Sequence, residues 1–159
     1  HTSNCNIYFA PVNGSVFLTN LTDSTVVISA CRQLRMKDCH RCIIFVCCGS
    51  TPVIEDSTEI RFGGVDTVWP VVGSAVMSGR IAAALNSTVE TAEKRLKESF
   101  KAVDDFTWLR STASPHWKMI SSTAQNEDIV SRVVERSSKV QMPSEEDVRT
   151  NPESCTKLF

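Results

Sequence analysis

The chain has 159 residues, of which 42% are hydrophobic, and this is enough for about one domain with its own core. Its formal net charge of -1 excludes a general attraction to nucleic acid or anionic lipid, so any function that depends on charge must be local. No apolar run is long enough to cross a bilayer, and we expect neither a transmembrane segment nor a nucleic-acid partner.

Residues 16–62 repeat themselves with a period close to 18 residues. A shift of 18 aligns Leu18 with Met36 and superimposes three polar turns, TNLTD, KDCHR and EDSTE. After each turn a shift of 17 gives the better match, because it aligns Ile28 with Phe45. Each repeat has the pattern of two short strands around a turn, without the 3.6-residue period of a helix.

This pattern predicts a mainly β fold, with a right-handed parallel β-helix over residues 1–72 in which each coil covers its neighbour's apolar face. An antiparallel meander is the alternative, since hairpins also place polar turns between alternating strands. The two differ in one respect. A β-helix stacks like residues at one level, whereas a meander does not.

Alternation of residue types assigns the faces of the strands. The residues expected to point inward are Leu34, Met36 and, after the turn, Ile43 and Phe45. Gln33, Arg35 and Lys37 then share the outer face. Glu55 falls one coil away from Lys37, so a carboxylate is expected beside these cations.

The second half of the chain changes character. Residues 73–121 are expected to form a divergent segment with a helix at 88–103, whose apolar face packs on a wall of the β-helix or caps its open end. Residues 122–159 are expected to form a polar C-terminal tail that is partly flexible, with a second helix at 126–137.

Seven cysteines are an odd number for a disulfide framework, and we expect them to serve as small buried hydrophobes in a reducing compartment. Cys39 and Cys42 have the spacing of a zinc or redox pair, but no second pair completes such a site. Three glycosylation motifs begin at Asn13, Asn20 and Asn86, and they keep open the alternative of a secreted, adhesive β-helix.

The segments RQLRMKDC, PVIED, DDFTWL and SPHW together resemble the tubulin-binding cofactor C domain family, which includes a retinitis pigmentosa protein. The resemblance covers about residues 5–70 and resumes at 104–109 and 114–117, while residues 71–98 do not follow it. It implies a β-helix that activates a GTPase by presenting an arginine to a nucleotide held by the partner.

The resemblance carries over to particular residues. It implies that Arg35 is the arginine finger, that Gln33 supports it, and that Glu55 and Phe106 contact the partner. Lys37, on the same outer face, is expected to steer an acidic partner. Arg32 stands where many members have glutamine, and this departure bears on the choice of partner.

Two partners are implied. The segments VCCGSTP and VQMPSEED favour an Arf-like small GTPase in its GTP state, which we expect first, whereas DDFTWL and SPHW favour tubulin with its cofactors. A non-catalytic cytoskeletal scaffold is a further alternative. Because the chain has no glycine-rich phosphate loop, we expect it to hold no cofactor of its own, with GTP and magnesium bound by the partner.

The same resemblance implies a location in the cytoplasm, at the cytoskeleton and the base of a cilium or flagellum. The first residue is His1 and not Met, so we expect the chain to begin inside a longer protein. Any targeting signal or lipid anchor would then lie upstream.

Overall fold

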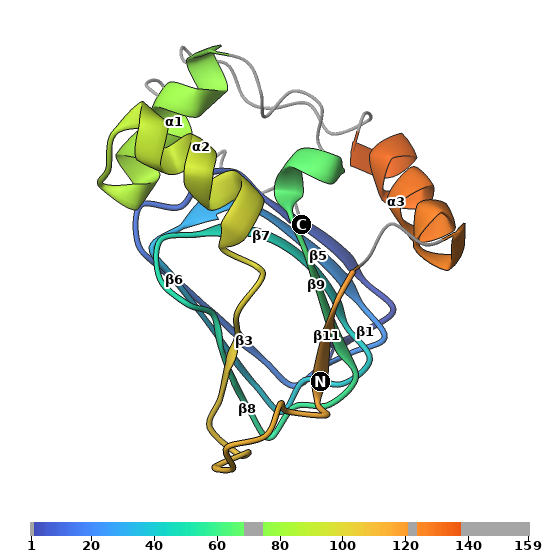
Figure 1. The fold of residues 1–159 in the computed structure, drawn as a ribbon. Helices are drawn as coiled ribbons and strands as arrows, with labels where there is room; N and C mark the ends of the chain where they lie inside the picture. The colour runs from blue at the N-terminus through green and yellow to red at the C-terminus, as the bar shows by residue number, and fades with distance from the viewer. Residues whose placement is uncertain (1, 69–74, 121–123, 138–159) are drawn as a thin grey trace.

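The computed structural model describes residues 2–68, 75–120 and 124–137. These residues build a parallel β-helix with helices along one side (Figure 1). Every described pair of strands is parallel, so the predicted β-helix is confirmed and an antiparallel meander is wrong. Residues 138–159 of the predicted flexible tail lie outside the described residues.

Three sheets form the sides of the β-helix. The four-stranded wall consists of β3 (Ser15–Thr19), β6 (Gln33–Lys37), β8 (Val53–Glu55) and β10 (Asp104–Asp105). The five-stranded wall consists of β2 (Asn6–Phe9), β5 (Thr25–Cys31), β7 (Ile43–Cys48), β9 (Ile60–Gly63) and β11 (Trp117–Met119). A short sheet pairs β1 (Thr2–Ser3) with β4 (Leu21–Thr22).

The offset between neighbouring coils is 18 residues in both walls. Leu18 pairs with Met36 as expected, but Ile28 pairs with Val46, so the predicted alignment of Ile28 with Phe45 is wrong. The offset falls to 17 only after an irregularity in β5, where Cys31 pairs with Cys48. Hydrogen bonds between coils keep the longer offset through each turn, and similarity of side chains does not override them.

The five-stranded wall is apolar on both faces, and this explains a second error. Ile44 and Val46 belong to the interior cluster, whereas Phe45 is buried on the outer face and Ile43 packs beside it. The prediction that Ile43 and Phe45 point inward is therefore wrong. Alternation cannot choose a face in a run such as IIFVCC, because helices cover the outer side and both faces are buried.

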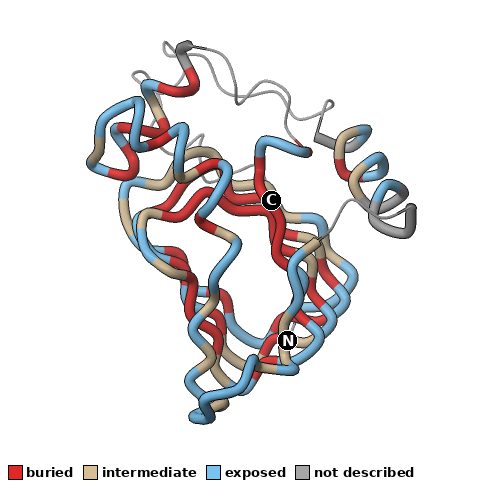
Figure 2. Tube along the Cα trace, in the orientation of Figure 1, coloured by how far each residue is buried: buried red, intermediate tan, exposed pale blue. Residues whose placement is uncertain are grey.

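The helices pack against the outer face of β5 and β7 (Figures 1 and 2). They are η1 (Val65–Thr67), α1 (Ala75–Leu85), α2 (Val89–Glu98) and α3 (Ala124–Ser137). The helix predicted at 88–103 is present as α2, and the side chain of Thr88 caps it by accepting from the Thr91 amide. The helix predicted at 126–137 is present as α3, and its Val133 is buried in the outer cluster.

The C-terminal end of the interior core is closed by residues that follow the helices. Phe100, Val103 and Trp117 pack against the interior cluster, and the ring of Trp117 meets Phe62 edge-on at 6.2 Å. After α2 the chain returns to the β-helix, where β10 pairs with β8 and β11 pairs with β9. The segment at 73–121 thus covers a wall and also completes the last coil.

The described cysteines act as part of the core. Five of the six are buried, and the thiols of Cys39 and Cys42 donate to backbone carbonyls of their own and neighbouring coils. Burial raises the pKa of both thiols. Among the described residues no cluster of side chains could hold a metal ion. Within the same residues, no helix is long and apolar enough to span a bilayer.

We expect Phe45→Ala to lower the free energy of unfolding by about 3–5 kcal/mol, because it empties a fully buried site under the helices. Phe17→Ala is the matched control, since Phe17 is 58% exposed and should change stability by less than about 1 kcal/mol. Urea denaturation followed by circular dichroism measures both. Equal losses in the two variants would contradict the outward, helix-covered position of Phe45.

Candidate partner-binding site

The outer face of the four-stranded wall carries the residues predicted for function. In β6, Gln33, Arg35 and Lys37 face outward, while Leu34 and Met36 between them are fully buried. This part of the predicted alternation is correct. Arg35 lies in register between Phe17 on β3 and Val53 on β8. The rigid ladder on both sides fixes the origin of the Arg35 side chain.

Glu55 joins the two cations. Its Oε2 lies 2.7 Å from Arg35 Nη2, and its Oε1 lies 3.0 Å from Lys37 Nζ. Hydrogen bonds from Arg35 and then from Lys37 hold the pKa of Glu55 below its usual value. The Arg35 side chain is 47% exposed, so the contact with Glu55 orients the guanidinium on the surface without burying it.

Phe106 meets the same guanidinium from the last coil. Its amide donates to the Ile54 carbonyl at 2.9 Å, and its ring centroid lies 5.7 Å from Arg35 Cζ, within the range of a cation–π contact. Of the five residues predicted for the site, Arg35, Lys37, Glu55 and Phe106 therefore form one cluster. Gln33 lies apart from it, and its Oε1 accepts from Ser15 Oγ at 3.4 Å.

A buried carboxylate positions Phe106. Asp105, whose side chain is 4% exposed, accepts from Ser114 Oγ at 2.5 Å and lies 2.7 Å from His116 Nδ1. Burial alone would raise the pKa of Asp105, but hydrogen bonds from Ser114 and His116 hold it below its usual value. On the other side of Phe106, Thr107 Oγ1 accepts from the Asp56 amide at 2.7 Å.

This group of serine, histidine and aspartate does not have the geometry of a hydrolase. Ser114 donates to Asp105 and not to His116, so no base activates the hydroxyl. Its effect is to close the loop between β10 and β11. The sequence segments DDFTWL and SPHW supplied the resemblance, but residue patterns could not show that their polar side chains bind each other.

Phe17 was missed in the sequence. It occupies an outward position of β3, between buried Val16 and Leu18, and is 58% exposed. The signal was present, because in SVFLT a phenylalanine stands where alternation calls for a polar residue. Together with Phe106, which is 52% exposed, it places exposed apolar surface on both sides of Arg35.

No described helix packs on the four-stranded wall, in contrast to the five-stranded wall (Figures 1 and 2). The fold and site together define a β-helical domain that presents one bare wall, with an arginine between exposed aromatics, to a macromolecular partner. A model of the tubulin binding cofactor C family matches residues 1–106, more than half of the chain. The chain belongs to this family.

Relatives show how far the similarity extends. The human tubulin-specific chaperone C is 29% identical over 123 residues, which cover 77% of this chain and 32% of the human protein. The chain thus spans about a third of the length of these curated relatives. Mouse protein XRP2 is 44% identical over only 41 residues, or 26% of this chain and 12% of that protein.

A solved structure supports the same assignment. The tubulin binding cofactor C from Leishmania major superposes with a TM-score of 0.64 and is 33% identical in sequence. The match covers 76% of this chain and 75% of that chain. The resemblance to the family inferred from sequence motifs is therefore confirmed by whole-domain comparison.

We expect Asp105→Asn to lower the free energy of unfolding at pH 7 by about 1–3 kcal/mol, because it weakens charge-assisted hydrogen bonds inside the loop. The folded-state pKa of Asp105 lies below the unfolded value of about 3.9. The stabilisation is therefore complete above the unfolded value and disappears as the pH falls through the folded value.

Asp104→Asn is the control, because Asp104 is the exposed neighbour in the same strand. Thermal unfolding at pH 7 and near pH 2 would measure the two variants against the wild type. The Asp105 variant should differ from the control at pH 7, and the difference should shrink in acid. A difference that is independent of pH would show that the ionised carboxylate is not what closes the loop.

Proposed function

We propose that this domain accelerates GTP hydrolysis on a protein partner by supplying Arg35 in trans as an arginine finger. The observation that carries the proposal is the position of Arg35, at the exposed centre of the one wall without helices, in a family match that spans that wall. The partner holds GTP and magnesium, and this chain contributes side chains only. Gln33 and Lys37 support the finger and the approach of the partner.

The chemistry suits arginine. During phosphoryl transfer to water, charge spreads over the γ-phosphate oxygens and the leaving oxygen, and a cation placed there stabilises the transition state. The guanidinium stays charged and offers forked donors, whereas lysine is a point charge. Such a finger contributes about 10³ to 10⁵ in rate, or ~4 to 7 kcal/mol.

The contacts of Arg35 allow it to move at little cost. An ion pair between exposed groups is worth about 0–1 kcal/mol, so the guanidinium can leave Glu55 for the nucleotide. Lys37 stays bound to the other oxygen of Glu55 and neutralises it after Arg35 has left. Glu55 thus holds the finger in the free protein and becomes available to the partner's surface.

Tubulin, acting with its cofactors, is the partner we propose first. Relatives named tubulin-specific chaperone C match 77% of this chain, and the similar solved structure is also a tubulin cofactor. Sequence segments had favoured an Arf-like GTPase, and one of them, VQMPSEED, lies outside the described residues. The longer matches reverse that order. A tubulin partner places the protein in the cytoplasm, at the cytoskeleton.

An Arf-like GTPase remains the second candidate, because the short match to protein XRP2 has the higher identity, 44%. With that partner the base of a cilium or flagellum becomes the expected location. The wall suits either partner through the same residues. Phe17 and Phe106 provide apolar contact on both sides of the finger, and such a ring excludes water from a central polar contact.

We expect Arg35→Lys to slow stimulated hydrolysis by about two orders of magnitude or more, because lysine cannot fork between two oxygens. Affinity for the GTP-bound partner should change by less than ~1 kcal/mol. Gln33→Ala should lose less rate, since it carries no charge. Single-turnover phosphate release with tubulin and its cofactors, and separately with an Arf-like GTPase, measures the effect.

Binding titrations with a non-hydrolysable GTP analogue on the partner separate the two roles. Wild-type rates in the Arg35→Lys protein would rule out the finger. Binding without any stimulated hydrolysis by the wild type would leave a cytoskeletal scaffold as the function of this domain.

We expect Phe17→Ala to weaken binding to the GTP-bound partner by about tenfold while the rate of the saturated complex changes less than about twofold. Phe106→Ala should behave in the same way. Val89→Ala is the control, because Val89 is a similarly exposed apolar residue on α2, away from the four-stranded wall. Equal effects of Phe17→Ala and Val89→Ala would remove Phe17 from the interface.

A further inference from the structure

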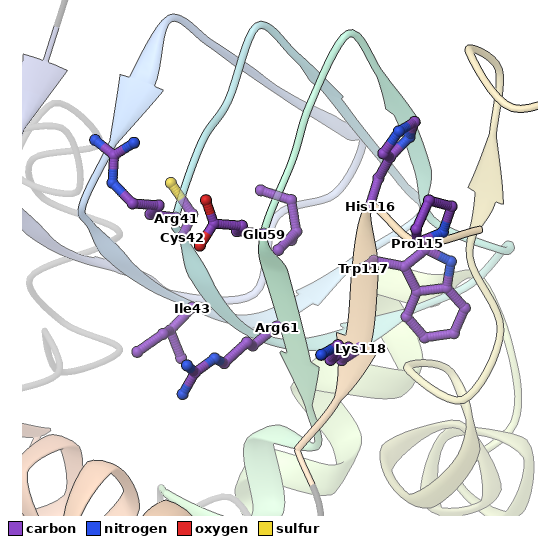
Figure 3. Close-up of a pocket in the computed structure, with 10 residues that line it drawn as sticks. Arg41, Cys42, Ile43, Glu59, Arg61, Pro115, His116, Trp117 and Lys118 are labelled. Carbon is purple, nitrogen blue, oxygen red and sulfur yellow. The ribbon is translucent and has the colours of Figure 1, made fainter.

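A second surface lies on the five-stranded wall, where a pocket of about 360 Å³ opens across β7, β9 and β11 (Figure 3). Its charged lining residues are Arg41, Glu59, Arg61 and Lys118, and Ile43 and Trp117 add apolar surface. We call it the basic pocket. None of its lining residues belongs to the four-stranded wall, so the proposed GTPase activation does not use it.

Two cations in the basic pocket face each other across neighbouring strands. Lys118 of β11 is the register partner of Arg61 of β9, and both side chains are exposed. Neighbouring strands are about 4.8 Å apart, and like charges directly opposite each other destabilise a sheet. Within the described residues, no ion pair or hydrogen bond joins either side chain to an acid.

The other basic residues near the coils are compensated, which sets Arg61 and Lys118 apart. Arg35 and Lys37 share Glu55, and both terminal nitrogens of Arg41 bond to the carboxylate of Asp23, at 2.6 and 2.7 Å. Glu59 also acts on Arg41 by its charge. The acids of this corner therefore serve Arg41, and the repulsion between Arg61 and Lys118 is left for a bound anion to relieve.

We propose that the basic pocket binds an acidic peptide segment of a partner protein, with neighbouring carboxylates over Arg61 and Lys118. The strands that line it use their amides in the ladder, as when Ile60 donates to His116 and Arg61 donates to Cys42. No helix N-terminus opens into it among the described residues. Compact phosphate sites use such amides, so side-chain cations spread along a sheet fit carboxylates on an extended chain better.

The rest of the lining favours a peptide as well. Ile43 lies next to Arg61 in the same outward row, and Trp117 precedes Lys118 in β11. An apolar side chain of the peptide can contact these while its acids meet the cations. Glu59 repels negative charge at the Arg41 end, so the acids are confined to the side of Arg61 and Lys118.

The test uses the ¹⁵N-labelled chain and an acetylated hexapeptide with the sequence Glu-Glu-Leu-Glu-Glu-Leu. Amide shifts recorded during titration at low salt should change first at residues 41–43, 59–61 and 115–118. Replacing every Glu of the peptide by Gln should abolish them. The net charge of the chain is -1, so the protein as a whole does not attract an acidic peptide and a localised response reports this pocket.

The double variant Arg61→Gln, Lys118→Gln should weaken binding by about tenfold. The matched control is Lys94→Gln, Lys97→Gln, which removes the same charge from exposed positions of α2 and should change binding less than about twofold. Lys118→Glu should raise the melting temperature of the isolated chain, because it replaces repulsion by attraction, and should also abolish binding.

Three results would overturn the proposal. Equal weakening by the two double variants would make the interaction a general effect of charge. Shifts spread over other surfaces would place the peptide elsewhere. Inorganic phosphate that produces the same localised shifts at the same concentration, with no added effect from the peptide, would make the pocket a site for small anions and not for a peptide.

Discussion

Each coil of the β-helix bonds to the next with an offset of 18 residues, and this ladder determines which outer residues can meet. It places Glu55 beside Lys37 and Phe17 beside Arg35, although these residues are far apart in the chain. The interior residues stack at the same levels and exclude water from the core. The functional wall is therefore a direct product of the register, and a change of one residue in a turn would turn its cations inward.

The two large walls have opposite surroundings, and their composition follows. The five-stranded wall is apolar on both faces because helices bury its outer side, whereas the four-stranded wall alternates because solvent meets it. Exposed phenylalanines on the second wall have no structural use in the isolated chain. Placing all helices on one side leaves the other side free for a partner.

Much of this could be predicted from the sequence, and the failures have a common cause. The period, the parallel β-helix and the outward position of Arg35 follow from alternation where one face is polar. The faces of Ile43 and Phe45 could not be predicted, because alternation is absent when both faces are buried. The clamp at Asp105 joins residues brought together by the final coil, and Arg61 meets Lys118 in the same coil; local patterns carry no record of such contacts.

The last coil has a consequence for how the protein matures during synthesis. Phe106 reaches Arg35 only after β10 has paired with β8, and the chain between these strands contains both α1 and α2. Closing a longer loop costs little additional free energy, but it delays the contact until the intervening segment has folded. The ribosome therefore releases a chain whose core coils assemble early and whose recognition surface is completed last, so premature engagement of a partner is avoided by the order of assembly.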